Sequence, residues 1–212
     1  MEDKIKVTSK NNPKISVHIT KGHFATSSAH RNIYIDIFDL KSSSAIAKEA
    51  ARVLAVPYLG NTVVDLIVYM DGTEILAAYM ANELLQAGSG VINEGSEIYL
   101  LAPVNRPDGS LIFHQNLHEK IRNKNVVVLT ATMSTGATVK SVSECLSYYS
   151  CKLVGISSVF TVAEEIEGWK IHALFSTEDI PDYRFYTPSE CVMCKEGKNI
   201  DALFNSEGYI KL

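Results

Sequence analysis

The residues best suited to chemistry follow an apolar run in the middle of the chain. Residues 126–129, Val-Val-Val-Leu, indicate a buried strand, and a small, hydroxyl-rich loop follows it: Ser134, Thr135, Gly136, Ala137 and Thr138. We expect a helix to begin at this loop, which would offer free backbone N–H groups and a positive dipole end to an anion. The loop therefore predicts a phosphate site, although the same residues would also suit an ordinary well-capped strand–helix connection.

Two common nucleotide motifs do not occur in the chain. It contains neither a Gly-x-x-x-x-Gly-Lys-Ser/Thr loop nor a Gly-x-Gly-x-x-Gly turn. A phosphate site at residues 134–138 would therefore be of another type, placed where open α/β sheets bind ligands, at the carboxyl ends of parallel strands.

Candidate metal ligands are present, but no complete set is visible along the chain. Cys191 and Cys194 form one Cys-x-x-Cys pair, whereas structural zinc needs four ligands. The other two of the four cysteines lie far off, and we expect structural or inert thiols, with metal binding and redox chemistry as alternatives. His23 and His30 are interpreted as hydrogen-bonded structural histidines. We expect no metal bound by the protein itself, and the role of Cys191 and Cys194 stays open.

Strands and helices alternate around the loop. Strands are expected at residues 33–38, 63–70, 97–104, 126–129, 153–162 and 172–175, with one more short strand after a Gly-Ser-Gly turn at 88–90. Helices are expected at 42–54, 75–85 and 139–149, and residues 105–110 have the composition of a surface loop. This order predicts an α/β fold with a mainly parallel central sheet flanked by helices. The less periodic residues from about 183 onward indicate an appended lobe.

Composition excludes several classes of protein. The chain has 212 residues, 46% of them hydrophobic and 21% charged, which is typical of a globular domain. A net charge of -4 argues against general binding to nucleic acids or to anionic membranes. Because the first residues are charged and no segment approaches the roughly 20 apolar residues of a membrane helix, we expect a cytoplasmic protein.

Four segments resemble one family. Residues 126–138 are similar to the phosphoribosyl pyrophosphate (PRPP) motif of type I phosphoribosyltransferases, in which two acidic residues, two apolar ones and Thr-Thr-Gly-Gly-Thr or a variant follow a strand. Residues 22–30, with Tyr34 and Asp36, resemble the Gly-His-Phe…Ser-Gly-x-His…Tyr segment of the orotate branch. Residues 68–84 resemble its pyrophosphate loop and next helix. Residues 188–197 resemble a Pro-x-Glu-Cys-Pro-x-Cys-x-x-Gly ending of many bacterial and archaeal members.

The resemblance implies a fold and a set of ligands. It implies one phosphoribosyltransferase-like domain over residues 1–212, with a core at about 55–182 and a small hood lobe from the N-terminal segment and about 183–212. The family transfers ribose phosphate from PRPP to a base such as orotate, with Mg²⁺ on the pyrophosphate, and the orotate branch forms homodimers. Phosphate would bind at residues 134–138, and the pyrophosphate loop would comprise Asp71, Gly72 and Thr73.

This chain departs from the family pattern at its ligand-handling positions. Thr130 and Ala131 replace the acidic pair, so neither supplies negative charge, although Thr130 could still bond a ribose hydroxyl. Arg106 is the sole cation in the loop at 104–110, where the family has Lys and His. Other departures are Gly72-Thr73 in place of Gly-Gly, with Glu74 after it, and Ser28-Ala29 in place of Ser-Gly.

We therefore expect an orotate phosphoribosyltransferase-like protein that binds PRPP or a nucleotide and has weak or lost transferase activity. One alternative is an active phosphoribosyltransferase that makes a nucleotide from PRPP and a pyrimidine base, with acids from elsewhere: Asp36, Asp39, Asp71 or Glu74. The other is a non-catalytic regulatory or scaffold module. The sequence does not define the base, the physiological ligand or a protein partner.

Overall fold

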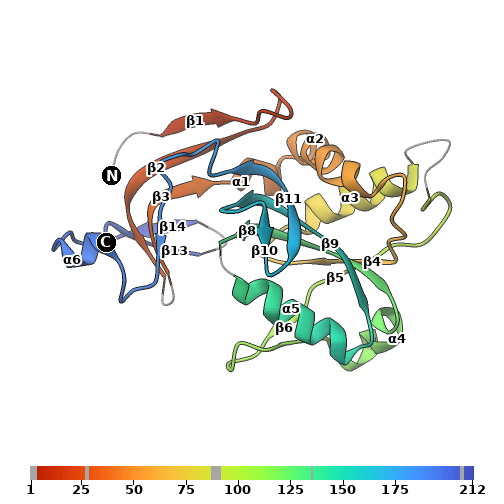
Figure 1. Cartoon of the computed structure of the whole chain (residues 1–212). Helices are drawn as coiled ribbons and strands as arrows, with labels where there is room; N and C mark the ends of the chain where they lie inside the picture. Colours follow the sequence, from red (N-terminus) through yellow and green to blue (C-terminus); the bar gives the residue numbers. More distant parts are fainter. Residues whose placement is uncertain (1–3, 27–28, 87–91, 135, 206–207) are drawn as a thin grey trace.

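The computed structural model describes residues 4–26, 29–86, 92–134, 136–205 and 208–212. The turn predicted at 88–90, Ser28 and Thr135 lie outside these ranges. The described chain forms two main sheets: the middle of the sequence builds one, and segments from both ends share the other (Figure 1). Within the described residues, no helix has the length and apolar character needed to span a bilayer.

The core sheet is mainly parallel, as predicted. Its strand order is β10 (Glu165–Ile166), β11 (Trp169–Ser176), β9 (Lys152–Thr161), β8 (Asn125–Met133), β4 (Leu66–Tyr69) and β5 (Tyr99–Leu101). Every neighbouring pair is parallel except β10 with β11. Residues 126–131 of β8 are all buried, because helices cover both faces of the sheet, and this explains their continuous apolar run.

Helices form a layer on each face of the core sheet (Figure 1). On one face α2 (Ser44–Ala55) and α3 (Glu74–Gln86) pack with β-strand residues such as Val127 and Leu129. On the other face α5 (Gly136–Tyr148) and α4 (His118–Ile121) pack with alternate residues of the same strand, Val126 and Val128. The short helix α1 (Phe38–Ser42) and the 3₁₀ turns η1 (Val56–Tyr58) and η2 (Gln115–Leu117) complete the connections.

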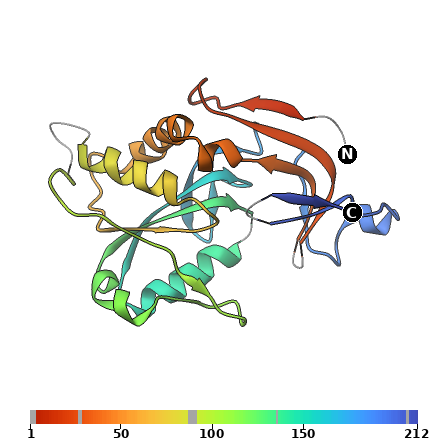
Figure 2. The same cartoon turned by 180° about the vertical axis from the view of Figure 1, so that it is seen from behind.

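The second sheet, which we call the hood, combines the two ends of the chain (Figure 2). Its order is β12 (Phe185–Tyr186), β3 (His30–Asp36), β2 (Ser16–Ala25), β13 (Ala202–Phe204) and β14 (Tyr209–Lys211), and β1 (Ile5–Thr8) also pairs with β2. The short helix α6 (Val192–Lys195) lies between β12 and β13 in sequence. Residues 38–55 form α1 and α2, which pack on α3 of the core and not in the hood sheet.

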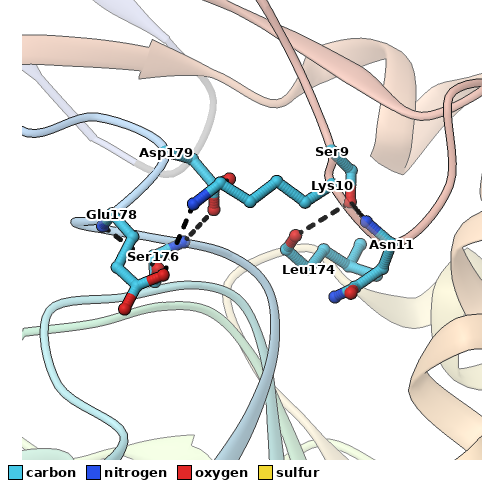
Figure 3. Close-up of polar contacts among 7 residues, drawn as sticks. All are labelled: Ser9, Lys10, Asn11, Leu174, Ser176, Glu178 and Asp179. Carbon is cyan, nitrogen blue, oxygen red and sulfur yellow. Dashed lines mark hydrogen bonds and ion pairs between the residues drawn. The ribbon is translucent and has the colours of Figure 1, made fainter.

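The connection between β1 and β2 reaches across to the core sheet (Figure 3). The Ser9 hydroxyl donates a hydrogen bond to the Leu174 carbonyl of β11 at 3.1 Å. The Lys10 ammonium lies 3.4 Å from a carboxylate oxygen of Glu178 and 3.9 Å from one of Asp179. Lys10 and Glu178 are exposed, so this ion pair stabilises little, and the buried Ser9 bond does more to hold the hood against the core.

Some predicted elements differ from the observed ones. Residues 92–98 form turns and no strand, because the buried Asn93 side chain accepts from the Val64 N–H at 2.9 Å and donates to the Thr62 carbonyl at 2.9 Å. The predicted surface loop at 105–110 is the turn of a hairpin, in which β6 (Val104–Asn105) pairs with β7 (Leu111–Ile112). The strands predicted at 33–38 and 63–70 are shifted or shortened to β3 and β4.

Candidate functional site

A cavity of about 280 Å³ lies between the core sheet and the hood. The core contributes residues at the carboxyl end of β8 and just after β4, where parallel sheets present ligand sites. The hood contributes a cation and two aromatic side chains. The residues that matter for the site are Asp71, Ala131, Ser134 and Thr138 from the core, and Arg31, Tyr34 and Phe204 from the hood.

The predicted phosphate loop lies at this cavity. Strand β8 ends at Met133 and α5 begins at Gly136, so Ser134 directly follows the strand and residues 136–138 form the first turn of the helix. Ser134 and Thr138 both line the cavity, whereas Ala137 is exposed. Two hydroxyl groups and the amino end of a 13-residue helix therefore meet at one wall, which is an arrangement that stabilises an anion.

An acidic side chain already contacts this loop. A Cβ atom placed on Gly136 would lie 2.7 Å from Cγ of Glu167, so the Glu167 side chain packs directly over the glycine. Glu167 is exposed and sits in the turn between β10 and β11, with a positive φ of 52°. The partial positive charge at the amino end of α5 attracts the negative charge of this side chain. Glu167 therefore competes electrostatically with any phosphate at the loop.

The replaced acidic pair has a different environment at each position. Thr130 is completely buried, and its hydroxyl donates to a carboxylate oxygen of Asp71 at 2.6 Å. It is not among the residues lining the cavity, so it is not placed to bond a ribose hydroxyl, contrary to our expectation. Ala131 does line the cavity. The wall therefore carries a methyl group where the family motif carries a charge.

The predicted pyrophosphate loop forms a tight turn between β4 and α3. Asp71 and Gly72 both have positive φ, 57° and 72°. Thr73 is fully buried, and its hydroxyl lies 2.7 Å from the Met70 carbonyl, which anchors the turn. A second cavity of about 120 Å³ is lined by Asp71 and Gly72 and also by Asn105 of the hairpin.

Two cations near these cavities were not predicted as site residues. Lys41 is only 9% exposed, and its ammonium donates a hydrogen bond to the Asp71 carbonyl at 3.3 Å. The Arg31 guanidinium lies 4.7 Å from the centre of the Phe204 ring and 6.0 Å from that of Phe185. The buried Nε of Arg31 has no hydrogen-bond partner within the described residues. Neither cation belongs to a sequence motif, because each reaches the site through contacts between distant segments.

Several other candidates lie away from the site. Of the four acids proposed as substitutes for the acidic pair, Asp71 lines the cavity. Asp36, Asp39 and Glu74 do not line it, and the Asp36 carboxylate forms an ion pair with Lys4 at 3.0 Å. Arg106 lies on the hairpin beside a different cavity of about 540 Å³. Another cavity, of about 560 Å³, is lined by residues of β11 and α2 and not by the phosphate loop, so cavity volume alone does not identify the site.

The cysteines fall into two groups. Burial raises the pKa of the Cys145 thiol to about 11, and burial also raises the pKa of Cys151, whose thiol donates to the Ile121 carbonyl at 2.7 Å. These two are inert thiols, since the reactive form is the thiolate. Cys191 and Cys194 instead lie beside His23 and His30 in the hood. Sequence spacing could not reveal this cluster, because its two halves are 168 positions apart.

The fold matches known phosphoribosyltransferases. The chain superposes on Leishmania donovani UMP synthase with a TM-score of 0.54 and 20% identity, covering 77% of this chain and 34% of that one. It also matches the orotate phosphoribosyltransferase of Mycobacterium tuberculosis H37Rv, solved in complex with Fe(III) dicitrate, with a TM-score of 0.52, 13% identity and coverage of 77% and 92%. Adenine phosphoribosyltransferase from Thermoanaerobacter pseudethanolicus matches with a TM-score of 0.50 and 14% identity, covering 82% of this chain and 95% of that one.

Two comparisons of the sequence found no match. The chain matches no protein-family model and no curated protein, and it spans about a third of the UMP synthase chain. At these identities the likeness concerns the fold. On that likeness, the chain has the type I phosphoribosyltransferase fold.

Proposed function

We propose that this protein is orotate phosphoribosyltransferase-like: it binds a phosphoribosyl ligand, PRPP or a nucleotide, and its transferase activity is weak or lost. One observation carries the proposal. The cavity of about 280 Å³ joins phosphate-loop hydroxyls to a hood cation and aromatic rings, but has Ala131 at a position where the family has an acid.

The two walls suit the two ends of such a ligand. Ser134, Thr138 and the amino end of α5 favour a phosphate group. On the opposite lobe, the Tyr34 and Phe204 rings meet edge to face with centres 6.4 Å apart and offer apolar surface for a base or ribose. Arg31 adds a planar cation that suits a carboxylate or a second phosphate.

Weak turnover follows from the missing charge. Positive charge would develop on the ribose during transfer, and a preorganised carboxylate beside it lowers the barrier. Removing one such electrostatic group typically costs about 10²–10³-fold in rate. Ala131 supplies no charge, and Thr130 is already bonded to Asp71.

Mg²⁺ fits this site only with help from the ligand. It prefers six oxygen ligands and commonly binds through one or two carboxylates together with substrate phosphates. Asp71 is the carboxylate residue among those lining the cavity in the described chain. Asp71 would therefore be the protein ligand, and the ion would neutralise the pyrophosphate when PRPP is bound.

An active enzyme is the second candidate, and Asp71 is the observation that favours it. Its carboxylate lies 2.6 Å from the hydroxyl of Thr130, the first position of the replaced pair. Asp71 thus brings negative charge close to the lost acid, from a neighbouring strand end. A homodimer, proposed from the family resemblance, is compatible with both candidates; light scattering would give its mass.

Our first prediction is saturable binding without ordinary turnover. Titration calorimetry with PRPP and Mg²⁺, or with a pyrimidine nucleotide, should give a defined heat of binding. Orotate consumption, followed by absorbance, should be at least about 100-fold below the usual 1–10³ s⁻¹. The double variant Ser134→Ala, Thr138→Val should lose the heat of binding and keep its fold.

Three other results would each change the conclusion. Turnover in the usual range that Asp71→Asn reduces by about 10²-fold would establish the active enzyme. Turnover in the usual range that Asp71→Asn does not change would contradict both proposed functions, the weakly active binding protein and the enzyme that uses Asp71. A folded protein with neither binding nor turnover would leave the scaffold interpretation.

Our second prediction concerns the acid at the phosphate loop. Glu167→Gln removes a negative charge next to Gly136, so the affinity for PRPP should rise about 2–5-fold, because a surface charge near a helix end contributes roughly 0.3–1 kcal/mol. The gain should shrink with added salt. Glu165→Gln on the neighbouring strand β10 is the matched control and should leave the affinity unchanged. Equal effects of both variants would mean that Glu167 does not act at the loop.

A further inference from the structure

Four potential metal ligands converge in the hood: His23, His30, Cys191 and Cys194. Their ligand atoms all lie within 4.8 Å of one another. Nε2 of His23 is 3.0 Å from Nδ1 of His30 and 3.5 Å from Sγ of Cys191. Sγ of Cys194 is 3.3 Å from Nδ1 of His30 and 3.7 Å from Nε2 of His23. Each group therefore approaches at least one other closely, and His23 approaches all three.

These separations match the edges of a zinc tetrahedron. With Zn–N of about 2.05 Å and Zn–S of about 2.3 Å, tetrahedral geometry places two nitrogens about 3.3 Å apart, nitrogen and sulfur about 3.6 Å apart, and two sulfurs about 3.8 Å apart. The observed 3.0, 3.3, 3.5 and 3.7 Å lie within a few tenths of an ångström of these edges. A set of two thiolates and two imidazoles in this geometry is typical of Zn²⁺.

The surroundings of His23 leave the correct nitrogen available. Its Nδ1 lies 3.2 Å from the Lys198 carbonyl oxygen and 3.1 Å from that of Asn199. A carbonyl oxygen can only accept, so Nδ1 carries the proton and Nε2 presents its lone pair to the cluster. A ligating histidine usually has such a second partner, which holds the ring in place.

The backbone holds the two halves of the cluster together. The N–H of His23 donates to the Asp201 carboxylate at 2.7 Å, and the Asp201 N–H donates to the His23 carbonyl at 2.8 Å. Cys191 directly precedes α6 and Cys194 lies within it. His23, His30 and Cys191 are buried, with exposures of 3%, 7% and 0%, so the cluster is enclosed by protein on most sides.

We propose that His23, His30, Cys191 and Cys194 bind one structural Zn²⁺ ion. Two thiolates balance the charge of the ion, and four protein ligands leave no position for water, so the site is structural and not catalytic. The ion joins strands β2 and β3 to the segment that carries α6. His30 adjoins Arg31, and the α6 segment leads into β13 with Phe204, so the metal also fixes the hood wall of the ligand cavity. The expectation of no protein-bound metal, drawn from the Cys-x-x-Cys pair alone, is replaced by this proposal.

The first test is metal content. The full chain, produced with added zinc, kept in reductant and freed of any affinity tag, is analysed by plasma mass spectrometry. We expect about one zinc per chain. Cys191→Ser and Cys194→Ser should each lower the content at least about fivefold, whereas Cys151→Ser, a cysteine outside the cluster, should retain it.

Cobalt gives a second test that needs no variant. If Co²⁺ replaces zinc in the wild-type protein, two thiolate ligands should produce a charge-transfer band in the near ultraviolet, and tetrahedral geometry should produce intense visible d–d bands. A folded wild-type protein that stays metal-free after incubation with Zn²⁺ and shows no thiolate–Co²⁺ band would overturn the proposal. Zinc retained equally by all three cysteine variants would also overturn it. Both outcomes are independent of PRPP binding, so they leave the proposed function standing.

Discussion

Replacing Gly155 by alanine is expected to lower the melting temperature by about 2–12 °C. A Cβ atom at this position would lie 2.8 Å from the hydroxyl oxygen and 2.9 Å from Cζ of Tyr58. Tyr58 is 2% exposed, and its hydroxyl pairs with that of Ser157 at 2.9 Å. The ring cannot move aside without breaking this buried contact, and overpacking of this kind costs roughly 1–3 kcal/mol. In a chain of this length each kcal/mol shifts the melting temperature by about 2–4 °C.

Differential scanning calorimetry measures this effect, and Gly60→Ala is the matched control. A Cβ atom at Gly60 would meet nothing within 4 Å, and no positive φ is required there. Its melting temperature should stay the same or rise slightly, since alanine reduces the entropy of the unfolded chain. If both alanine variants melted at the wild-type temperature, the tight packing of Tyr58 over β9 would be wrong.

Replacing Arg31 by methionine is expected to weaken binding of PRPP or a pyrimidine nucleotide about 10–100-fold. Methionine keeps much of the apolar contact with Phe204, where the guanidinium lies 4.7 Å from the ring centre. It removes the charge and the buried Nε donor that has no partner among the described residues. A hydrogen bond to a charged group contributes about 1.5–3 kcal/mol, and each 1.4 kcal/mol is about tenfold in Kd.

Two further variants separate charge from geometry in that experiment. Arg31→Lys keeps the positive charge but loses the planar guanidinium group, so calorimetry should give a Kd between those of the wild type and Arg31→Met. Lys120→Met removes an exposed cation that lies over the Tyr99 ring, away from the cavity, and should leave the Kd unchanged. Wild-type affinity in a folded Arg31→Met protein would show that the ligand does not reach the hood wall.

The long core elements were predictable from the sequence because their signals are local. The apolar run at 126–129 predicted β8, and the predicted helices at 42–54, 75–85 and 139–149 correspond to α2, α3 and α5. Where side chains override the local pattern, prediction failed: the turns around Asn93 depend on its amide group and not on hydrophobic periodicity. The hairpin at β6 and β7 was missed because each strand is two residues long.

The candidate site was predictable on the core side and not on the hood side. Residues 134–138 are contiguous, so their chemistry is visible in the sequence. On the hood side, Arg31 lies at the cavity beside Phe204, a residue distant in the sequence, and no spacing rule describes this contact. The four-residue cluster of His23, His30, Cys191 and Cys194 joins two pairs from opposite ends of the chain, and neither pair alone indicates four ligands.

The shared hood sheet has a consequence for biosynthesis. Strand β13 pairs in parallel with β2, with Ala202 opposite Phe24, and β12 pairs with β3. During translation β2 and β3 are synthesised before the core sheet, whose last strand ends at Ser176. Until β12 and β13 are made, the edges of β2 and β3 that pair with them are unpaired. The hood closes last, after a long loop has been brought together. A nascent chain that stops before residue 202 therefore contains the whole core sheet, the phosphate loop and the hood residues Arg31 and Tyr34, but lacks Phe204, which lines the same cavity.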